Sequence, residues 1–121
     1  MPAAAVILFA HGAREPDWAR PFEQVRDRLR TEGLRVELAY LEIMTPSLEE
    51  AARRLAAEGF SKVTIAPLFL AQGGHLKHQL PELVAKLRER HANIDFRVIP
   101  ALGDEREILA AIAEWVQRAA R

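Results

Sequence analysis

Two histidines stand where apolar runs of the chain end. His11 directly follows the run "VILFA", and His75 follows "PLFL" after the four residues "AQGG". Imidazole nitrogens bind divalent metals and exchange protons near neutral pH, since the group has an ordinary pKa of about 6.5. If both runs are strands of one sheet, the two rings meet at one edge of that sheet. The pair is therefore the first candidate for a metal-binding or proton-transfer site.

Glu42 adds a carboxylate to this pair, because it follows the alternating run Val36–Tyr40 and falls on the same predicted edge. Two imidazoles and one carboxylate suit a mid-row divalent ion such as Co, Ni, Fe or Zn. The sequence has no cysteine, so zinc–thiolate sites, disulfides and cysteine nucleophiles are excluded. The alternative for each of the three residues is a surface role, as a loop histidine bonded to nearby backbone or a solvated carboxylate.

The residues around the histidines suggest a large, anionic ligand. Gly73 and Gly74 precede His75, and glycines let a bulky, flat molecule press against the backbone. Arg14 and Lys77 flank the two histidines and could meet a negatively charged substrate, with ordinary surface charge as the alternative. Other chemistries lack support, because the chain has no G-x-S-x-G motif and neither of the glycine-rich phosphate motifs.

Strand-like and helix-like segments alternate four times along the chain. The predicted strands are Val6–Ala10, Val36–Tyr40, Val63–Leu70 and the stretch around Phe96 and Val98. Apolar residues at helical spacing predict a helix after each strand, with S-x-x-E at Ser47 and D-x-x-E at Asp104 as N-terminal caps. This alternation is typical of an α/β domain with right-handed crossovers and a parallel sheet.

The apolar patterns also predict the order of the strands. The first and third strands are apolar on both faces, as central strands covered by helices must be, whereas the second and fourth alternate and are placed at the edges. The simplest order is 2-1-3-4, with Pro67 near the end of its strand because proline cannot donate to the ladder. Ligands of such sheets bind at the carboxyl ends of the strands where the connections diverge, here between the strands that precede His11 and His75.

Length and composition set the remaining limits. The 121 residues fit one globular domain over residues 1–121. The 17 basic and 17 acidic residues balance, which argues against nucleic acid or an anionic membrane as a partner. No apolar run approaches the roughly 20 residues of a membrane span, and no basic segment opens the chain as in a secretory signal. We therefore expect a cytoplasmic protein.

Three blocks of the sequence together resemble a known family. They are "FAHGAREP", "LAYLEIMTPSLEEAARRL" and "PLFLAQGGHLKHQLPEL". In order and spacing they are similar to the short-form sirohydrochlorin cobalt chelatases of the class II chelatase superfamily, and the resemblance covers nearly the whole chain. It implies a chelatase-like three-layer domain, with helices on both faces of the sheet, that inserts a divalent metal into the tetrapyrrole sirohydrochlorin without ATP. It implies no permanently bound cofactor. The metal is a substrate, with cobalt first and iron or nickel as alternatives.

The resemblance also implies roles for individual residues. The family's metal-binding histidines fall on His11 and His75, and a carboxylate that some relatives add falls on Glu42. The substrate-contacting loop falls on Leu70, Ala71, Gln72, Gly73, Gly74 and His75. Arg14, Met44 and Lys77 complete the candidate substrate contacts, although the turn at Met44 is also explained as a simple lead into the helix cap.

The sequence departs from the family pattern at two places. Ala13 stands where the family usually has a serine, which removes one hydroxyl contact. His78 and Gln79 stand where an acidic residue commonly precedes the "LP" of the third helix. If that acid relays protons or attracts the metal in relatives, this protein must manage without it.

Metal insertion must remove two pyrrole protons, and we expect His11 to accept them. We expect His75 to be the main residue that positions the ion, with Glu42 assisting. The reverse assignment of the two histidines stays open. One four-stranded domain offers only one wall to a tetrapyrrole, so we expect a symmetric homodimer with the macrocycle between two copies. Two alternatives remain: a carrier that binds metal or tetrapyrrole without turnover, and a half-domain that needs a different partner chain.

Overall fold

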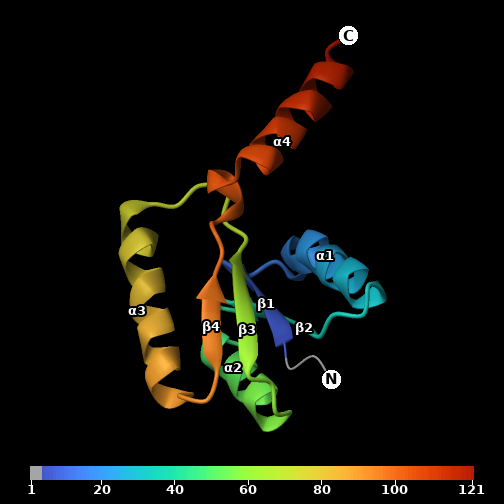
Figure 1. Cartoon of the computed structure of the whole chain (residues 1–121). Helices are drawn as coiled ribbons and strands as arrows, with labels where there is room; N and C mark the ends of the chain where they lie inside the picture. Colours follow the sequence, from blue (N-terminus) through green and yellow to red (C-terminus); the bar gives the residue numbers. More distant parts are fainter. Residues whose placement is uncertain (1–3) are drawn as a thin grey trace.

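The computed structural model describes residues 4–121 and has a three-layer α/β arrangement (Figure 1). The strands are β1 (Ala4–Ala10), β2 (Val36–Tyr40), β3 (Lys62–Pro67) and β4 (Asp95–Val98). The helices are α1 (Arg20–Thr31), α2 (Leu48–Ala57), α3 (Gly74–Arg90) and α4 (Arg106–Ala119), with short 3₁₀ turns η1 (Pro16–Ala19) and η2 (Leu102–Asp104). The predicted domain also includes residues 1–3, which lie outside the described part.

The sheet confirms the predicted strand order, since β2-β1-β3-β4 run parallel side by side. Leu8 of β1 lies opposite Leu38 of β2 and Ala66 of β3. Pro67 is the last residue of β3, where the missing N–H removes little from the ladder. The carboxyl ends of β1, β2 and β3 therefore meet at one edge, which is where the predicted site residues follow them.

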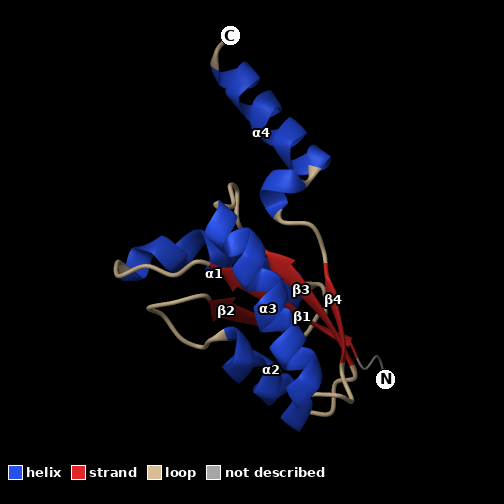
Figure 2. Cartoon of the chain, turned by 90° about the vertical axis from the view of Figure 1, so that its left-hand side faces the viewer, coloured by secondary structure: helices blue, strands red, loops and turns tan. Residues whose placement is uncertain are grey.

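Helices cover both faces of the sheet, as the turned view also shows (Figure 2). On one face, Ile7, Phe9 and Ile65 are buried against α2 and α3. On the other face, Leu8 and Leu38 are buried with residues of α1 and η1. Within the described residues, no helix is both long and apolar enough to cross a membrane.

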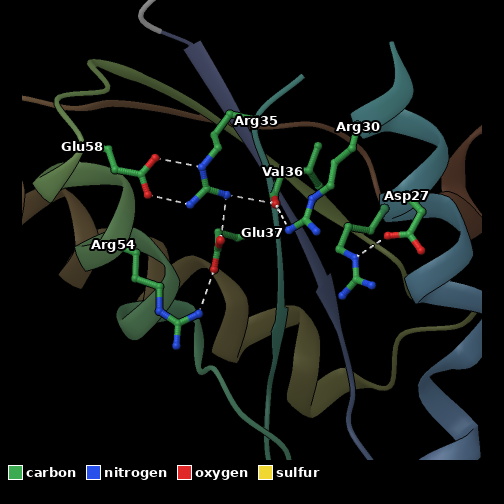
Figure 3. Close-up of polar contacts among 8 residues, drawn as sticks. Asp27, Arg30, Arg35, Val36, Glu37, Arg54 and Glu58 are labelled. Atoms are coloured by element: carbon green, nitrogen blue, oxygen red, sulfur yellow. Dashed lines mark hydrogen bonds and ion pairs between the residues drawn. The ribbon is translucent and has the colours of Figure 1, made fainter. Parts of the chain in front are cut away.

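The edge strand β2 is more deeply buried than its alternating pattern predicts. Glu37, expected on a solvated face, is only 7% exposed. Its carboxylate accepts from Arg35 at 2.7 Å and from Arg54 of α2 at 3.1 Å, so two guanidinium groups compensate the buried charge (Figure 3). Arg35 also donates two hydrogen bonds to Glu58, and these lower the pKa of Glu58 while they raise that of Arg35. The network fastens the sheet edge to α2.

The predicted cap of α2 is confirmed as a reciprocal capping box. The backbone N–H of Glu50 donates to Ser47 Oγ at 3.1 Å, and the backbone N–H of Ser47 donates to Glu50 Oε1 at 2.9 Å. Hydrogen bonding of the Glu50 carboxyl to the backbone N–H of Ser47, and secondly to its hydroxyl, lowers the pKa of that carboxyl. The box fixes the start of α2 directly after the turn that carries Glu42.

The predicted cap at Asp104 is wrong. The last helix begins at Arg106 with Glu105 at its N-cap, and no side chain caps it. Asp104 lies instead in η2, where its carboxylate accepts a hydrogen bond from Gln72 Nε2 at 3.4 Å. The carboxylate of Asp104 therefore links η2 to the loop before α3. Helix α4 projects away from the body of the domain (Figure 1).

Candidate active site

A cleft of about 570 Å³ opens at the carboxyl edge of the sheet. His11 and Glu42 reach it from the ends of β1 and β2, and His75 reaches it from the first turn of α3. We call it the carboxyl-edge cleft; it is lined by His11, Leu41, Glu42, Leu68, Phe69, Leu70, Ala71, Gly73, His75, Leu76 and Gln79. The predicted convergence of the three polar residues on one edge is thus present in the fold.

Gly12 lets the ends of β1 and β2 approach each other closely. Leu41 N–H donates to the carbonyl of Ala10 at 2.9 Å, and Glu42 N–H donates to the carbonyl of His11 at 3.1 Å. Gly12 has φ +98°, and a Cβ at this position would lie 1.9 Å from the carbonyl oxygen of Glu42. Only glycine fits this contact, which holds the backbones of His11 and Glu42 together at the cleft.

The side chain of His11 is exposed on one side and supported on the other. Its ring meets that of Phe69 edge to face, with the centroids 6.4 Å apart. Phe69 is itself buried and makes a second edge-to-face contact with Phe9 in the core, at 5.6 Å. The imidazole of His11 is therefore accessible to a ligand on one side and packs against the buried ring of Phe69 on the other.

The loop between β3 and α3 brings His75 to the same edge. Leu68 N–H donates to the carbonyl of Phe9 at 2.8 Å, so pairing with β1 continues past the end of β3. Gly73 is the N-cap of α3, and a Cβ on Gly73 or Gly74 would meet nothing within 4 Å. Packing within the chain does not require these glycines, which agrees with a role in admitting a bulky ligand.

The structure divides the predicted substrate contacts into two groups. Leu70, Ala71 and Gly73 line the carboxyl-edge cleft. The remaining candidates are not among its lining residues, and they are Arg14, Met44, Gln72, Gly74 and Lys77. Met44 is half-buried against the α1-side core, and Gln72 is bonded to Asp104, which explains why these two point elsewhere. Arg14 and Lys77 are exposed near the histidines, so their proposed role in steering an anion stays a prediction.

The three polar residues line one cleft without forming a finished metal site. Among the described residues, no three His, Asp or Glu side chains lie close enough together to hold an ion. The ligand roles of His11, Glu42 and His75 therefore stay predictions. An entering ion would have to draw these exposed side chains together by rotation about their own side-chain bonds.

Sequence reasoning missed the apolar part of the cleft. Leu41, Phe69 and Leu76 line it together with Gln79, and none of them was a candidate contact. A signal was present for Phe69, because this aromatic residue stands next to the end of the apolar run that precedes the loop. Gln79 occupies the position where the family commonly has an acid, so the departure from the family pattern falls inside the cleft.

The family model for CbiX matches residues 5–119. The chain belongs to the CbiX family. A protein of Saccharolobus islandicus named sirohydrochlorin cobaltochelatase is 32% identical over 106 residues, which are 88% of this chain and 78% of that protein. A protein of Sulfurisphaera tokodaii with the same name is 27% identical over 96% of this chain and 93% of its own length. The match spans only 57% of the relative from Methanopyrus kandleri and 59% of that from Methanothermobacter thermautotrophicus.

Solved structures agree with the family assignment. A CbiX protein from Marinobacter aquaeolei VT8 superposes with a TM-score of 0.85 at 28% identity, covering 97% of this chain and 94% of that one. The sirohydrochlorin chelatase SirB from Bacillus subtilis subspecies spizizenii, solved with cobalt, has the same fold with a TM-score of 0.79 at 20% identity. That superposition covers 95% of this CbiX-family chain but only 50% of the SirB chain.

Proposed function

We propose that this CbiX-family protein inserts a divalent metal, cobalt in the first instance, into sirohydrochlorin without ATP. The observation that carries the proposal is the carboxyl-edge cleft, which His11, Glu42 and His75 line from three separate segments. Support comes from the family assignment and from relatives that bear the name sirohydrochlorin cobaltochelatase. Metal insertion needs a place to hold the ion and a group to accept protons, and we assign both roles to side chains that line this cleft.

His11 is the proposed proton acceptor. Its ring is exposed on the side away from Phe69, so it is accessible to the pyrrole nitrogens of a bound macrocycle. His75 in the first turn of α3 would hold the ion beside the macrocycle, and Glu42 would add a negative charge that offsets the loss of water from the ion. Each pyrrole N–H bond broken releases one proton, while the nitrogen keeps the electron pair that binds the metal.

The walls of the cleft suit a flat macrocycle that carries carboxylates. Leu41, Leu70 and Leu76 supply apolar surface for its rings, and the open space over Gly73 allows close approach to the backbone. The first turn of α3 contains no acidic residue. Its unpaired backbone N–H groups therefore favour the negatively charged groups of the substrate.

A single domain covers only one face of such a substrate, and we propose a homodimer with the macrocycle between two copies. The strand ends of one four-stranded sheet form a single wall, which contacts a flat macrocycle from one side only. The superposition covers only 50% of SirB, so that protein has about as much chain again beyond one domain with this fold. A second copy would supply the wall that the single chain lacks.

The decisive experiment mixes metal-free sirohydrochlorin, cobalt and protein, and follows the visible spectrum of the macrocycle. We expect catalytic turnover, with the rate reduced by about 10²–10⁴ in His11→Ala. His78→Ala is the matched control, since His78 lies on the exposed surface of α3 outside the cleft and its loss should leave the rate unchanged. Metallation no faster than the protein-free mixture would refute the proposal, and one product per chain would indicate a carrier.

Metal binding measured by calorimetry shows which of the two histidines holds the ion and which accepts the protons. If His75 holds the ion, His75→Ala loses affinity for cobalt, whereas His11→Ala keeps that affinity and loses turnover. The opposite pattern would assign the proton acceptor to His75. Competition among cobalt, nickel and iron in the same spectral assay identifies the preferred metal.

A further inference from the structure

The turn after β2 holds a β-branched residue in a left-handed backbone conformation. Ile43 has φ +70°, and among the described residues it is the one non-glycine residue with a positive φ. The N–H of Met44 donates to the carbonyl of Glu42 at 2.7 Å, so the three residues form a tight turn with Ile43 at its centre. A three-residue turn with a positive φ at its centre is the rare and strained form, and a β-branched side chain makes this conformation less favourable still.

Contacts on both sides of the turn hold it in this conformation. Gly12 packs against the carbonyl of Glu42 from the β1 side. The N–H of Tyr40 donates to the carbonyl of Pro46 at 2.9 Å, which ties the end of β2 to the segment that leads into α2. The chain that leaves Glu42 must therefore return within a few residues, and Ile43 occupies the position where it reverses. Strain of this kind persists only where the surroundings fix the backbone, and it is characteristic of functional sites.

Neither backbone preference nor core packing accounts for an isoleucine at this position. At the three other positive-φ positions of the described chain the residue is glycine, which adopts this conformation without penalty. The Ile43 side chain is 59% exposed and belongs to neither of the two buried clusters. Its neighbours on the turn do have contacts, since Glu42 lines the carboxyl-edge cleft and Met44 packs on the α1-side core. The apolar side chain of Ile43 therefore stands on the rim of the cleft, outside the core of the described chain.

Leu70 is a second exposed apolar side chain at the same edge of the sheet. It is also 59% exposed, it lines the carboxyl-edge cleft, and its carbonyl is fixed against Gly103. Because β1 lies between β2 and β3, the segments that carry Ile43 and Leu70 flank His11 from opposite sides. At the level of the backbone the two segments are two strand spacings apart, or about 10 Å. A ligand that covers both side chains must be wide and apolar, which fits a tetrapyrrole macrocycle and does not fit a single small ring.

We propose that Ile43 is a substrate-positioning residue, whose side chain packs on the macrocycle on the β2 side of His11 while Leu70 packs on it on the β3 side. Two apolar contacts on opposite sides of His11 keep the pyrrole nitrogens beside that imidazole, whereas a single contact would let the ring system slide. The strained turn keeps the Ile43 side chain on the rim, where the macrocycle reaches it. This inference rests on the proposed function, because it takes sirohydrochlorin as the ligand of the cleft.

The first test measures the binding of metal-free sirohydrochlorin by the change in its visible spectrum, with no metal present. Asparagine is the chosen replacement, because it tolerates a positive φ but offers no apolar surface. We expect Ile43→Asn to weaken macrocycle binding about tenfold, through the loss of one apolar contact of this size. Ile43→Val removes only one methylene and should stay within about threefold of the wild type. Leu34→Asn is the matched control, since Leu34 is 44% exposed just before β2, at the opposite edge of the sheet, and its loss should not change the binding.

Thermal denaturation of the free protein supplies a second measurement, which should move in the opposite direction. Ile43→Asn relieves the backbone strain, so we expect its Tm to rise by about 2–5 °C although its macrocycle binding is weaker. Ile43→Val keeps the strain and Leu34→Asn relieves none, so neither variant should gain in Tm. The affinity of Ile43→Asn for cobalt, measured by calorimetry, should equal that of the wild type because the backbone of Glu42 keeps its contacts.

The outcomes separate this inference from the proposed function. Equal macrocycle binding by the wild type and Ile43→Asn would overturn the inference and leave the proposed function intact. A lower Tm or weaker cobalt binding in Ile43→Asn would also overturn it, because the loss would then come from a disturbed turn. A smaller assembly mass of this variant in light scattering would assign Ile43 to a contact between copies, against the proposal. A wild type that binds the macrocycle without metallating it would sink only the proposed function, and one that binds no macrocycle would refute both.

Discussion

Replacing Gly12 by alanine tests the backbone contact on which the site depends. Alanine at φ +98° carries a left-handed penalty of about 1–2 kcal/mol. Its Cβ would stand 1.9 Å from Glu42 O, so the two chain segments must also separate by about 1.5 Å to reach ordinary contact. That movement breaks the two hydrogen bonds that join the ends of β1 and β2, each worth about 1 kcal/mol. The expected loss of unfolding free energy is about 3–4 kcal/mol.

Gly33→Ala is the control for backbone strain alone. Gly33 has a similar φ of +87°, but a Cβ there would meet nothing within 4 Å. Its loss should be only about 1–2 kcal/mol, so thermal denaturation should separate the two variants by roughly 8 °C in Tm. Gly12→Ala should also metallate sirohydrochlorin more slowly, because His11 and Glu42 move apart, whereas Gly33→Ala should not. Equal losses of Tm in the two variants would refute the reasoning.

Three further substitutions test other parts of the chain. Glu37→Gln weakens two charge-assisted hydrogen bonds at a buried carboxylate, although Arg35 keeps its pair with Glu58, and should cost about 1.5–3 kcal/mol in urea unfolding. Glu58→Gln, in a more exposed pair, should cost less than about 1 kcal/mol. Equal costs would contradict the burial argument. Ser47→Ala should cost roughly 1 kcal/mol near neutral pH through loss of the cap. The folded pKa of Glu50 lies below its ordinary value of 4.5, so the stabilisation by its carboxylate is complete above pH 4.5 and is lost as the pH falls through the folded pKa. The difference in Tm between the wild type and Ser47→Ala should therefore become smaller in acid. A difference that does not change with pH would count against the capping box. Gly73→Ala should keep stability within about 1 kcal/mol of the wild type but raise KM for sirohydrochlorin several-fold, and an unchanged KM would show that the macrocycle does not pack there.

The sequence was sufficient to predict the sheet because burial patterns are local. Strands that are apolar on both faces must lie in the centre, and this placed the strand before His11 beside the strand before His75. Once the order 2-1-3-4 is known, the meeting of their carboxyl ends follows from the geometry of parallel strands. The convergence of the histidines was therefore predictable without knowledge of any side-chain conformation.

What the sequence did not predict depends on contacts between distant segments. Glu37 alternates with apolar neighbours and so suggests an exposed face, yet Arg54, 17 residues along the chain, makes its burial possible. The apolar stripe of α4 was correctly predicted, but its periodicity says only that the stripe needs a cover and not which molecule supplies it. Asp104 had the spacing of a cap, and only the fold places Gln72 within its reach.

Two close backbone contacts explain how the cleft combines rigid edges with exposed side chains. At one end Gly12 sits against the carbonyl of Glu42, and at the other Gly103 sits against the carbonyl of Leu70. Phe69 lies between them, since its ring supports His11 and its carbonyl accepts from Gly103. The backbone of the site is thus fixed from β2 to the root of α4 before any ligand arrives. The imidazoles and the carboxylate are exposed to solvent. The proposed metal insertion requires such exposure, because an ion that is bound briefly must then pass into another molecule.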